Sequence, residues 1–257
     1  MIVEYHRPKT VEEALTLLSR SGILSIPLGG GSGIDRSTIE PIAVIDLQDL
    51  GLNTLRARGN TLDLGATVTL QALLDYPRLQ PALFQAIRHE ANYNLRQVAT
   101  VSGTLVVADG RSPFTTAMLA LDARLTIRTG NDQSKEEKIG LGDLLPIRKE
   151  KLPGKLITHI TILHTLRLAY TYVARTPADR PIVCAAVAGW PSGRTRVALG
   201  GFGAAPLLAM DGSGAEGAEI AAQNAYSQAG DEWATAEYRQ EVAGVLVRRC
   251  MEEISSQ

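Results

Sequence analysis

The sequence has few cysteines and histidines, and its basic residues are balanced by acidic ones. It has two cysteines, Cys184 and Cys250, far apart in 257 residues and outside any Cys-x-x-Cys pattern. This argues against a disulfide framework or a cysteine-ligated cluster within the chain. The four histidines show no metal-binding spacing, so no metal site is predicted. The 26 basic residues are matched by 27 acidic ones and are not gathered into a basic stripe, which argues against nucleic acid as a partner.

Long hydrophobic runs are also missing. The longest nearly uncharged stretch beside a predicted strand, residues 181–191, is too short to span a bilayer. The first residues include Glu4, His6 and Arg7, which leaves no apolar core for a signal peptide. We therefore expect no membrane span and a cytoplasmic location. A content of 45% hydrophobic and 21% charged residues is typical of a soluble globular protein.

Glycine, by contrast, is concentrated in one short stretch. Residues 28–33 read Leu-Gly-Gly-Gly-Ser-Gly and follow an apolar run that predicts a strand at residues 23–28. Glycines without a Cβ let backbone N–H groups face an anion, and the Ser32 hydroxyl adds a donor. The pattern is neither the spaced glycine fingerprint of a Rossmann fold nor a P-loop, which needs a lysine. A diphosphate cradle and a plain flexible turn both fit this stretch taken alone.

A second glycine segment, Thr-Val-Ser-Gly-Thr at residues 100–104, is predicted to be a loop. It again combines a glycine with hydroxyl side chains, those of Thr100, Ser102 and Thr104. Hydroxyl donors that recur at both segments favour a shared role in binding phosphate over two unrelated turns.

The order of the predicted elements indicates an α/β start followed by an α+β half. Thr10 and Glu13 form a capping box at the start of a helix that Gly22 ends. Apolar patterning around and after that helix predicts further elements of the first half. These are strands at residues 2–5, 23–28 and 43–47, a hairpin over 55–64, helices at 69–75, 82–91 and 114–121, a strand at 123–128 and a charged turn at 131–138.

The pattern of predicted elements changes near residue 151. A short helical turn at residues 141–145 precedes a charged loop at 147–154, which is predicted to be a domain boundary. Strands are then predicted at residues 156–163, 166–173, 182–188 and 195–199, followed by helices at 218–229 and 235–254. Strands followed by helices are typical of an α+β domain.

Several segments, taken in order, carry a family resemblance. They read Gly-Gly-Gly-Ser at 29–32, Leu-Gly-Ala-Thr-Val-Thr at 64–69, Asn-Leu-Arg-Gln-Val-Ala-Thr-Val-Ser-Gly-Thr-Leu at 94–105, Pro-Gly-Lys-Leu-Ile-Thr at 153–158 and Ala-Thr-Ala-Glu-Tyr-Arg at 234–239. The chain resembles, nearly end to end, the FAD-binding medium subunit of the molybdenum hydroxylases, the xanthine dehydrogenase and carbon monoxide dehydrogenase family. Their flavin domain is of the PCMH, or vanillyl-alcohol-oxidase, type.

The resemblance implies an α+β fold with two domains. Residues 1–151 would form a PCMH-type FAD-binding domain, with lobes at about 1–53 and 54–151. Residues 152–257 would form a small α+β C-terminal domain of antiparallel strands and two helices.

The resemblance also implies that the cofactor is FAD and that the two glycine segments flank its diphosphate. The candidate cofactor-binding residues are Leu28, Gly29, Gly30, Gly31, Ser32, Gly33, Ala99, Thr100, Val101, Ser102, Gly103, Thr104, Asp109 and Leu156. Leu156, with Leu144, Leu145 and Ile157, is an apolar candidate for packing the flavin ring. No catalytic residue and no metal ligand is predicted.

The function that the resemblance implies is electron transfer within an oxidoreductase. Electrons would pass from iron–sulfur clusters of a small subunit through FAD to NAD, a quinone or oxygen, after a molybdenum-cofactor large subunit has oxidised the substrate. The chain would be one subunit of the enzyme, catalytically incomplete alone, and a homodimer stays open. The sequence names neither the substrate nor the acceptor.

Two other functions stay open. Ser102 stands where the family has glycine, a family aspartate has no equivalent near Asp109, and residues 170–173 lack the family's lysine. One alternative is therefore a degenerate structural subunit that binds FAD weakly or not at all. The other is a stand-alone flavin oxidase of the same superfold.

Overall fold

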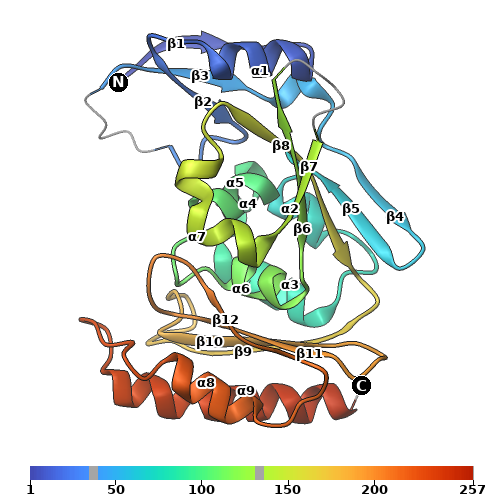
Figure 1. Cartoon of the computed structure of the whole chain (residues 1–257), viewed down its shortest axis with the longest axis vertical. Coiled ribbons are helices and arrows are strands. Elements are labelled where there is room, and N and C mark those ends of the chain that lie inside the picture. The colour runs from blue at the N-terminus through green and yellow to red at the C-terminus, as the bar shows by residue number, and fades with distance from the viewer. Residues whose placement is uncertain (35–39, 131–135, 257) are drawn as a thin grey trace. The chain divides into compact units, whose positions relative to one another are not determined.

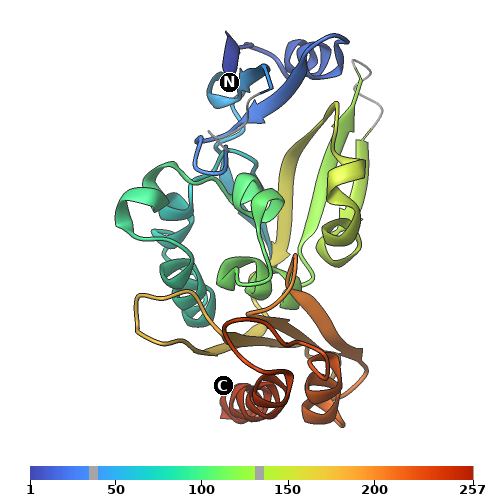
Figure 2. The same cartoon turned by 90° about the vertical axis from the view of Figure 1, so that its left-hand side faces the viewer.

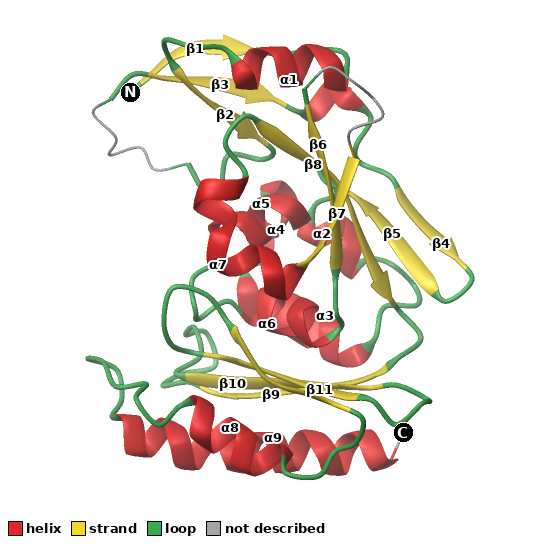
Figure 3. Cartoon of the chain, in the orientation of Figure 1, coloured by secondary structure: helices red, strands yellow, loops and turns green. Residues whose placement is uncertain are grey.

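The computed structural model describes residues 1–34, 40–130 and 136–256. They form two compact units, each assembled from three separate stretches of chain. Unit 1 comprises Met1–Asp75, Tyr93–Val107 and Arg124–Thr161, and unit 2 comprises Tyr76–Asn92, Ala108–Ala123 and Ile162–Gln257. Both units mix strands and helices (Figure 3), which confirms the α+β prediction.

The N-terminal part of unit 1 is a parallel sheet covered by a helix (Figure 1). Strands β1 (Ile2–His6), β3 (Ile42–Asp46) and β2 (Leu24–Leu28) lie in that order, with β3 fully buried at the centre. Helix α1 (Val11–Ser19) packs Ala14, Leu15 and Leu18 onto this sheet. The predicted strand–helix–strand start is therefore confirmed.

Helix α1 begins at the predicted capping box. The Thr10 hydroxyl accepts a hydrogen bond from the Glu13 N–H at 3.2 Å, and the Glu13 carboxylate reaches back to the Lys9 N–H at 2.8 Å. The first bond satisfies a donor that the helix start leaves open, and the second ties the residue before the cap to the first turn of the helix. The helix ends at Ser19, three residues before Gly22, whose φ of +100° places it in the left-handed region.

The rest of unit 1 is built on a five-stranded sheet. The strand order is β4 (Leu55–Arg58), β5 (Thr61–Gly65), β8 (Lys155–Leu163), β6 (Arg124–Thr129) and β7 (Glu136–Gly140). The same unit contains helices α2 (Leu70–Leu74), α4 (Tyr93–Val98), α5 (Val101–Val107) and α7 (Leu141–Lys151). The hairpin predicted over residues 55–64 is the β4–β5 pair.

One prediction near residue 151 is wrong. Residues 147–151 form the end of α7 rather than a boundary loop, although Pro146 lies inside this helix. Basic residues in the last turn suit the negative end of a helix dipole, and Lys151 pairs with Glu137 of β7 at 2.6 Å. Strand β8, the first strand after this helix, pairs with β6 inside unit 1. A domain boundary at residue 151 stays a prediction.

The charged turn predicted at residues 131–138 is tested only in part. Residues 131–135 lie outside the described residues, whereas 136–138 already belong to strand β7.

Unit 2 is an antiparallel sheet with helices on both faces (Figures 1 and 2). The strand order is β12 (Leu207–Gly212), β11 (Thr195–Gly200), β10 (Val183–Gly189) and β9 (Arg167–Val173). Helices α8 (Ala218–Ala225) and α9 (Ala236–Ser256) cover one face, and α3 (Pro81–Glu90) and α6 (Pro113–Ala120) cover the other. Every residue of β10 is buried, as expected for a strand covered on both sides.

Strand β12 was not predicted. It lies between the glycine turn at residues 200–203 and the low-complexity stretch after Gly212, and both signals favour a loop. This segment is a strand because it pairs in antiparallel fashion with β11, a contact that the local sequence does not predict.

A fully buried arginine fixes the start of α9. Arg239, from the Tyr-Arg pair of the family resemblance, has no exposed side-chain surface. Its guanidinium donates to the backbone carbonyls of Ile182 at 3.2 Å and Ala229 at 2.6 Å, and it pairs with the Asp231 carboxylate at 2.7 Å. One side chain therefore joins α9 to the sheet and to the turn that follows α8.

We predict that Arg239→Met strongly destabilises the protein. The change leaves the buried carbonyls of Ile182 and Ala229 without their donor, at a cost of about 1–3 kcal/mol for each unsatisfied group. Arg248→Met is the matched control on the same helix, because Arg248 is exposed and its partner, Glu219, lies at the surface; it should cost at most about 1 kcal/mol. Urea unfolding of both variants is the measurement, and equal losses would contradict the prediction.

Candidate functional site

The carboxyl ends of the parallel strands in unit 1 meet at one pocket. The residues directly after β1 and β2, Arg7 and Gly29, line it together with Gln48, which follows β3. The pocket has a volume of about 380 Å³. Its other lining residues are Gly30, Asn53, Thr67, Thr69, Gln97, Val98 and Thr100. Ligands of open α/β sheets typically bind at this edge, in pockets of roughly 300–1,000 Å³.

The structure brings the two predicted glycine segments side by side. A Cβ built on Gly30 would lie 1.6 Å from the Val98 carbonyl oxygen, and one on Gly33 would lie 2.6 Å from Val107 Cγ1. A Cβ on Gly29 would meet the Thr100 hydroxyl at 2.6 Å. Glycine is therefore required here for close approach between two backbones, a reason that the sequence alone did not reveal.

The first segment, residues 29–33, presents backbone donors that the fold does not use. None of its five N–H groups donates a hydrogen bond to another residue in the described part of the chain. Ser32 and Gly33 are exposed, while Gly29, Gly30 and Gly31 are half-buried, and Leu28 ends strand β2. A row of unpaired amides at the end of a strand is suited to bind an anion.

The second segment differs from its prediction, because it is not a loop. Helix α5 starts at Val101 with Thr100 as its cap: the Thr100 hydroxyl accepts from the Gly103 N–H at 3.2 Å. The Val101 N–H donates to the Val68 carbonyl at 2.8 Å. The Ser102 hydroxyl donates to the Ala66 carbonyl at 2.7 Å.

The hydroxyls of the second segment are therefore engaged within the protein. Thr104 also donates, to the Thr100 carbonyl at 2.8 Å, and the buried Ala99 accepts from the Leu70 N–H at the same distance. Ser102 sits in ordinary helical backbone, so serine at this family glycine position causes no backbone strain. A direct role for residues 99–104 in binding phosphate stays a prediction, while Thr100 does line the pocket.

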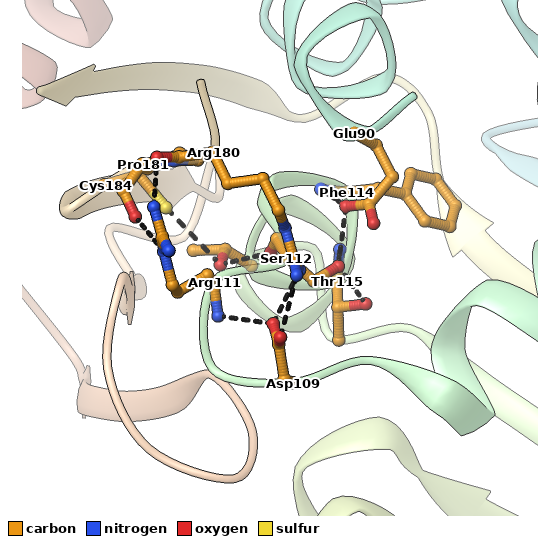
Figure 4. Close-up of polar contacts among 10 residues, drawn as sticks. Glu90, Asp109, Arg111, Ser112, Phe114, Thr115, Arg180, Pro181 and Cys184 are labelled. Carbon is orange, nitrogen blue, oxygen red and sulfur yellow. Dashed lines mark hydrogen bonds and ion pairs between the residues drawn. The ribbon is translucent and has the colours of Figure 1, made fainter. Parts of the chain in front are cut away.

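The remaining two candidates lie elsewhere. Leu156 is 2% exposed and packs with Ala14, Leu15 and Leu18 in the core under α1. Asp109 belongs to unit 2, where its carboxylate receives two hydrogen bonds from the Arg180 guanidinium, at 2.7 and 2.5 Å (Figure 4). Their contact with a cofactor stays a prediction.

Arg111, two residues after Asp109, also makes contacts within the protein. It donates to the carbonyls of Pro181 at 2.9 Å and Arg180 at 2.6 Å, as Figure 4 shows. Its guanidinium lies over the Trp233 ring, 4.3 Å from the centroid. These contacts hold together the surface loops of unit 2.

Seven pocket residues were not singled out from the sequence as site residues. They are Arg7, Gln48, Asn53, Thr67, Thr69, Gln97 and Val98. The available signal was the family resemblance, because Thr67 and Thr69 lie in its segment at 64–69 and Gln97 and Val98 lie in its segment at 94–105. Thr67 differs from the others in one respect. Its hydroxyl is buried and has no hydrogen-bond partner among the described residues.

A buried carboxylate in unit 2 caps helix α6. Glu90 accepts a hydrogen bond from the Ser112 hydroxyl at 2.7 Å and from the Phe114 N–H at 3.1 Å (Figure 4). Burial raises the pKa of Glu90 above its ordinary value, and these two donors oppose the rise only in part.

Comparison with known proteins identifies the family. Residues 1–162 match the family described as the FAD binding domain in molybdopterin dehydrogenase. The chain belongs to this family. Members of the molybdopterin dehydrogenase FAD-domain family are oxidoreductase subunits, and FAD is the cofactor that this membership indicates.

Relatives match over nearly the whole chain. The protein YgfM of Escherichia coli (strain K12) is 30% identical over 255 residues, covering 96% of this chain and 94% of that one. The carbon monoxide dehydrogenase medium chain of Afipia carboxidovorans is 25% identical and covers 97% and 95%. Reconstituted CO dehydrogenase from Oligotropha carboxidovorans superposes with a TM-score of 0.84 at 25% identity, over 98% of this chain and 97% of that one.

The pocket residues fit FAD in two respects. Among the described residues, the amides of residues 29–33 are unpaired and can receive the charged diphosphate, and the Thr67 hydroxyl has no partner, so a ligand can supply one. Within the described ranges, no cluster of histidine, cysteine, aspartate or glutamate is arranged to hold a metal ion, and no helix is long and apolar enough to cross a membrane.

We predict that Gly30→Ala disrupts the site. The new methyl group would overlap the Val98 carbonyl, so the turn must move away from α4, at a cost of about 1–3 kcal/mol for overpacking. FAD affinity should fall with it, because the amides move. Gly214→Ala is the matched control, since a Cβ there meets open space. Urea unfolding and FAD titration of both variants test this, and a Gly30→Ala protein as stable as Gly214→Ala would contradict it.

We also predict a pH signature for Glu90. Above its ordinary pKa of 4.5, the folded state retains a proton that the unfolded chain releases, so stability falls as pH rises toward the raised pKa. Glu90→Gln keeps an acceptor for Ser112 and Phe114 and removes this dependence. The free energy of unfolding, measured from about pH 4.5 to about pH 8, should decline more steeply in the wild type than in Glu90→Gln. Glu241→Gln, at an exposed site, should follow the wild type; parallel curves for all three proteins would refute the assignment.

Proposed function

We propose that the chain is the FAD-carrying electron-transfer subunit of a multi-subunit molybdenum-dependent dehydrogenase. The observation that carries this proposal is the row of unpaired amides at residues 29–33, at the edge of a parallel sheet, in a chain of the molybdopterin dehydrogenase FAD-domain family. FAD, when bound, supplies the redox chemistry, accepting electrons and passing them on.

The residues of the chain hold and position the cofactor. The amides of residues 29–33 bind the diphosphate, and the Ser32 hydroxyl is exposed beside them as a further donor. Val98 and Thr100 press against Gly30 and Gly29 and so fix the turn in place. The second glycine segment thus serves the site by supporting the first.

The proposal extends to partners. The relatives of known name are called medium chains or subunits, and the chain spans 95% of the length of the carbon monoxide dehydrogenase medium chain. We infer a large subunit with the molybdenum cofactor, which selects the substrate, and a small subunit with iron–sulfur clusters, which delivers electrons to this FAD. An external acceptor then removes them. A cytoplasmic location remains part of the proposal.

A second candidate is a subunit that keeps the fold and binds FAD weakly. The observation that favours it is the internal use of the Thr100, Ser102 and Thr104 hydroxyls, which leaves fewer donors for the diphosphate than the sequence suggested. The two candidates differ in one measurable quantity, the FAD content of the chain.

We predict that the tagged chain, purified from its native cells, carries FAD and is accompanied by molybdenum and iron. Flavin absorbance, elemental analysis and mass spectrometry of the same sample measure these three. Flavin without either metal would support a stand-alone flavin oxidase, and both metals without flavin would support the structural subunit. The chain alone, with neither flavin nor any FAD-induced rise in Tm, would overturn the proposal.

A further inference from the structure

Thr67 stands out among the residues of the pocket. It follows β5, and its backbone N–H donates to the Leu52 carbonyl at 2.9 Å. The side chain is 8% exposed, and its hydroxyl has no hydrogen-bond partner in the described structure. A buried hydroxyl without a partner is destabilising, because it has lost its hydrogen bonds to water and gained none.

Neighbouring threonines on the same wall do not share this state. The Thr69 hydroxyl accepts from the Ala72 N–H at 3.1 Å as the cap of α2, and the Thr100 hydroxyl accepts from the Gly103 N–H as the cap of α5. Both have a structural task, whereas the Thr67 hydroxyl has none. A valine at position 67 would fill the same space without the unsatisfied hydroxyl. A threonine at this position is therefore best explained by a ligand that accepts its hydrogen bond.

The rest of the pocket indicates the charge of that ligand. Arg7 is the one charged residue among those that line it, and it is a cation. Its carboxylate partner, Asp49 at 2.7 Å, is not part of the lining. Gly29 and Gly30 add amides with no acceptor among the described residues. A positive charge with unpaired N–H and O–H donors suits a phosphate group.

We propose that Thr67 is a further FAD-binding residue, whose hydroxyl donates a hydrogen bond to a phosphate oxygen held at Gly29 and Gly30. This inference rests on the proposed function. Binding then relieves the cost that the hydroxyl imposes on the free protein, so part of the affinity for FAD comes from Thr67.

The test compares two substitutions at Thr67 with a matched one. Thr67→Val should bind FAD about tenfold more weakly than the wild type, whereas Thr67→Ser, which keeps the hydroxyl, should remain within about twofold. Thr158→Val is the control. Thr158 is also buried, lies in β8, accepts a hydrogen bond from the Ala66 N–H through its backbone carbonyl and is outside the pocket, so this variant should bind FAD as the wild type does. Flavin fluorescence titration gives the Kd values.

Stability supplies an independent readout. Because valine removes an unsatisfied hydroxyl, the Tm of FAD-free Thr67→Val should be no lower than that of the wild type, and its rise on adding FAD should be smaller. Equal FAD affinity in Thr67→Val and the wild type would overturn the inference and leave the hydroxyl to a bound water.

Failure of the proposed function gives a different result. If wild-type protein binds no FAD, the same variants are titrated with inorganic pyrophosphate and with ADP, followed by thermal shift. A response that Thr67→Val weakens and Thr67→Ser retains would keep Thr67 as a phosphate-binding residue of a non-flavin site. No response, or one that is equal in all variants, would overturn the Thr67 inference as well.

Discussion

The site depends on the contact between two backbones at Gly30 and Val98. A hydrogen atom on the Gly30 Cα lies where any side chain would overlap the Val98 carbonyl. This contact holds the end of β2 against the end of α4, and thereby places the unpaired amides of residues 29–33 beside the pocket. Protein interiors are closely packed, so a contact this tight fixes the position of the turn.

The two glycine segments consequently have unequal tasks. The first has N–H donors that are unpaired among the described residues. The second uses its donors within the protein, because the Ser102 hydroxyl donates to the Ala66 carbonyl and the Val101 N–H donates to the Val68 carbonyl. The strength of those bonds decides how rigidly the first segment is presented. A rigid row of amides binds an anion with little loss of conformational entropy on binding.

Sequence reasoning succeeded where the signal is local. The capping box at Thr10, the strand before Gly29 and the strands of unit 2 apart from β12 follow from periodicity and turn residues. It missed α5, because Gly103 and the β-branched residues around it are poor helix formers and the supporting carbonyls come from residues 66–68. It missed Thr67 for a related reason: whether a hydroxyl has a partner is a property of the folded chain alone.

The interleaving of the two units limits how this protein can be divided. The family match ends at residue 162, but α3 and α6, which lie within it, pack on a sheet that begins at Arg167. Every residue of α6 is buried. A chain ending at residue 162 would expose that apolar helix to water, so we expect that residues 1–162 do not fold alone. A chimera that replaces residues 1–162 with those of a relative would therefore also need the four-stranded sheet of that relative.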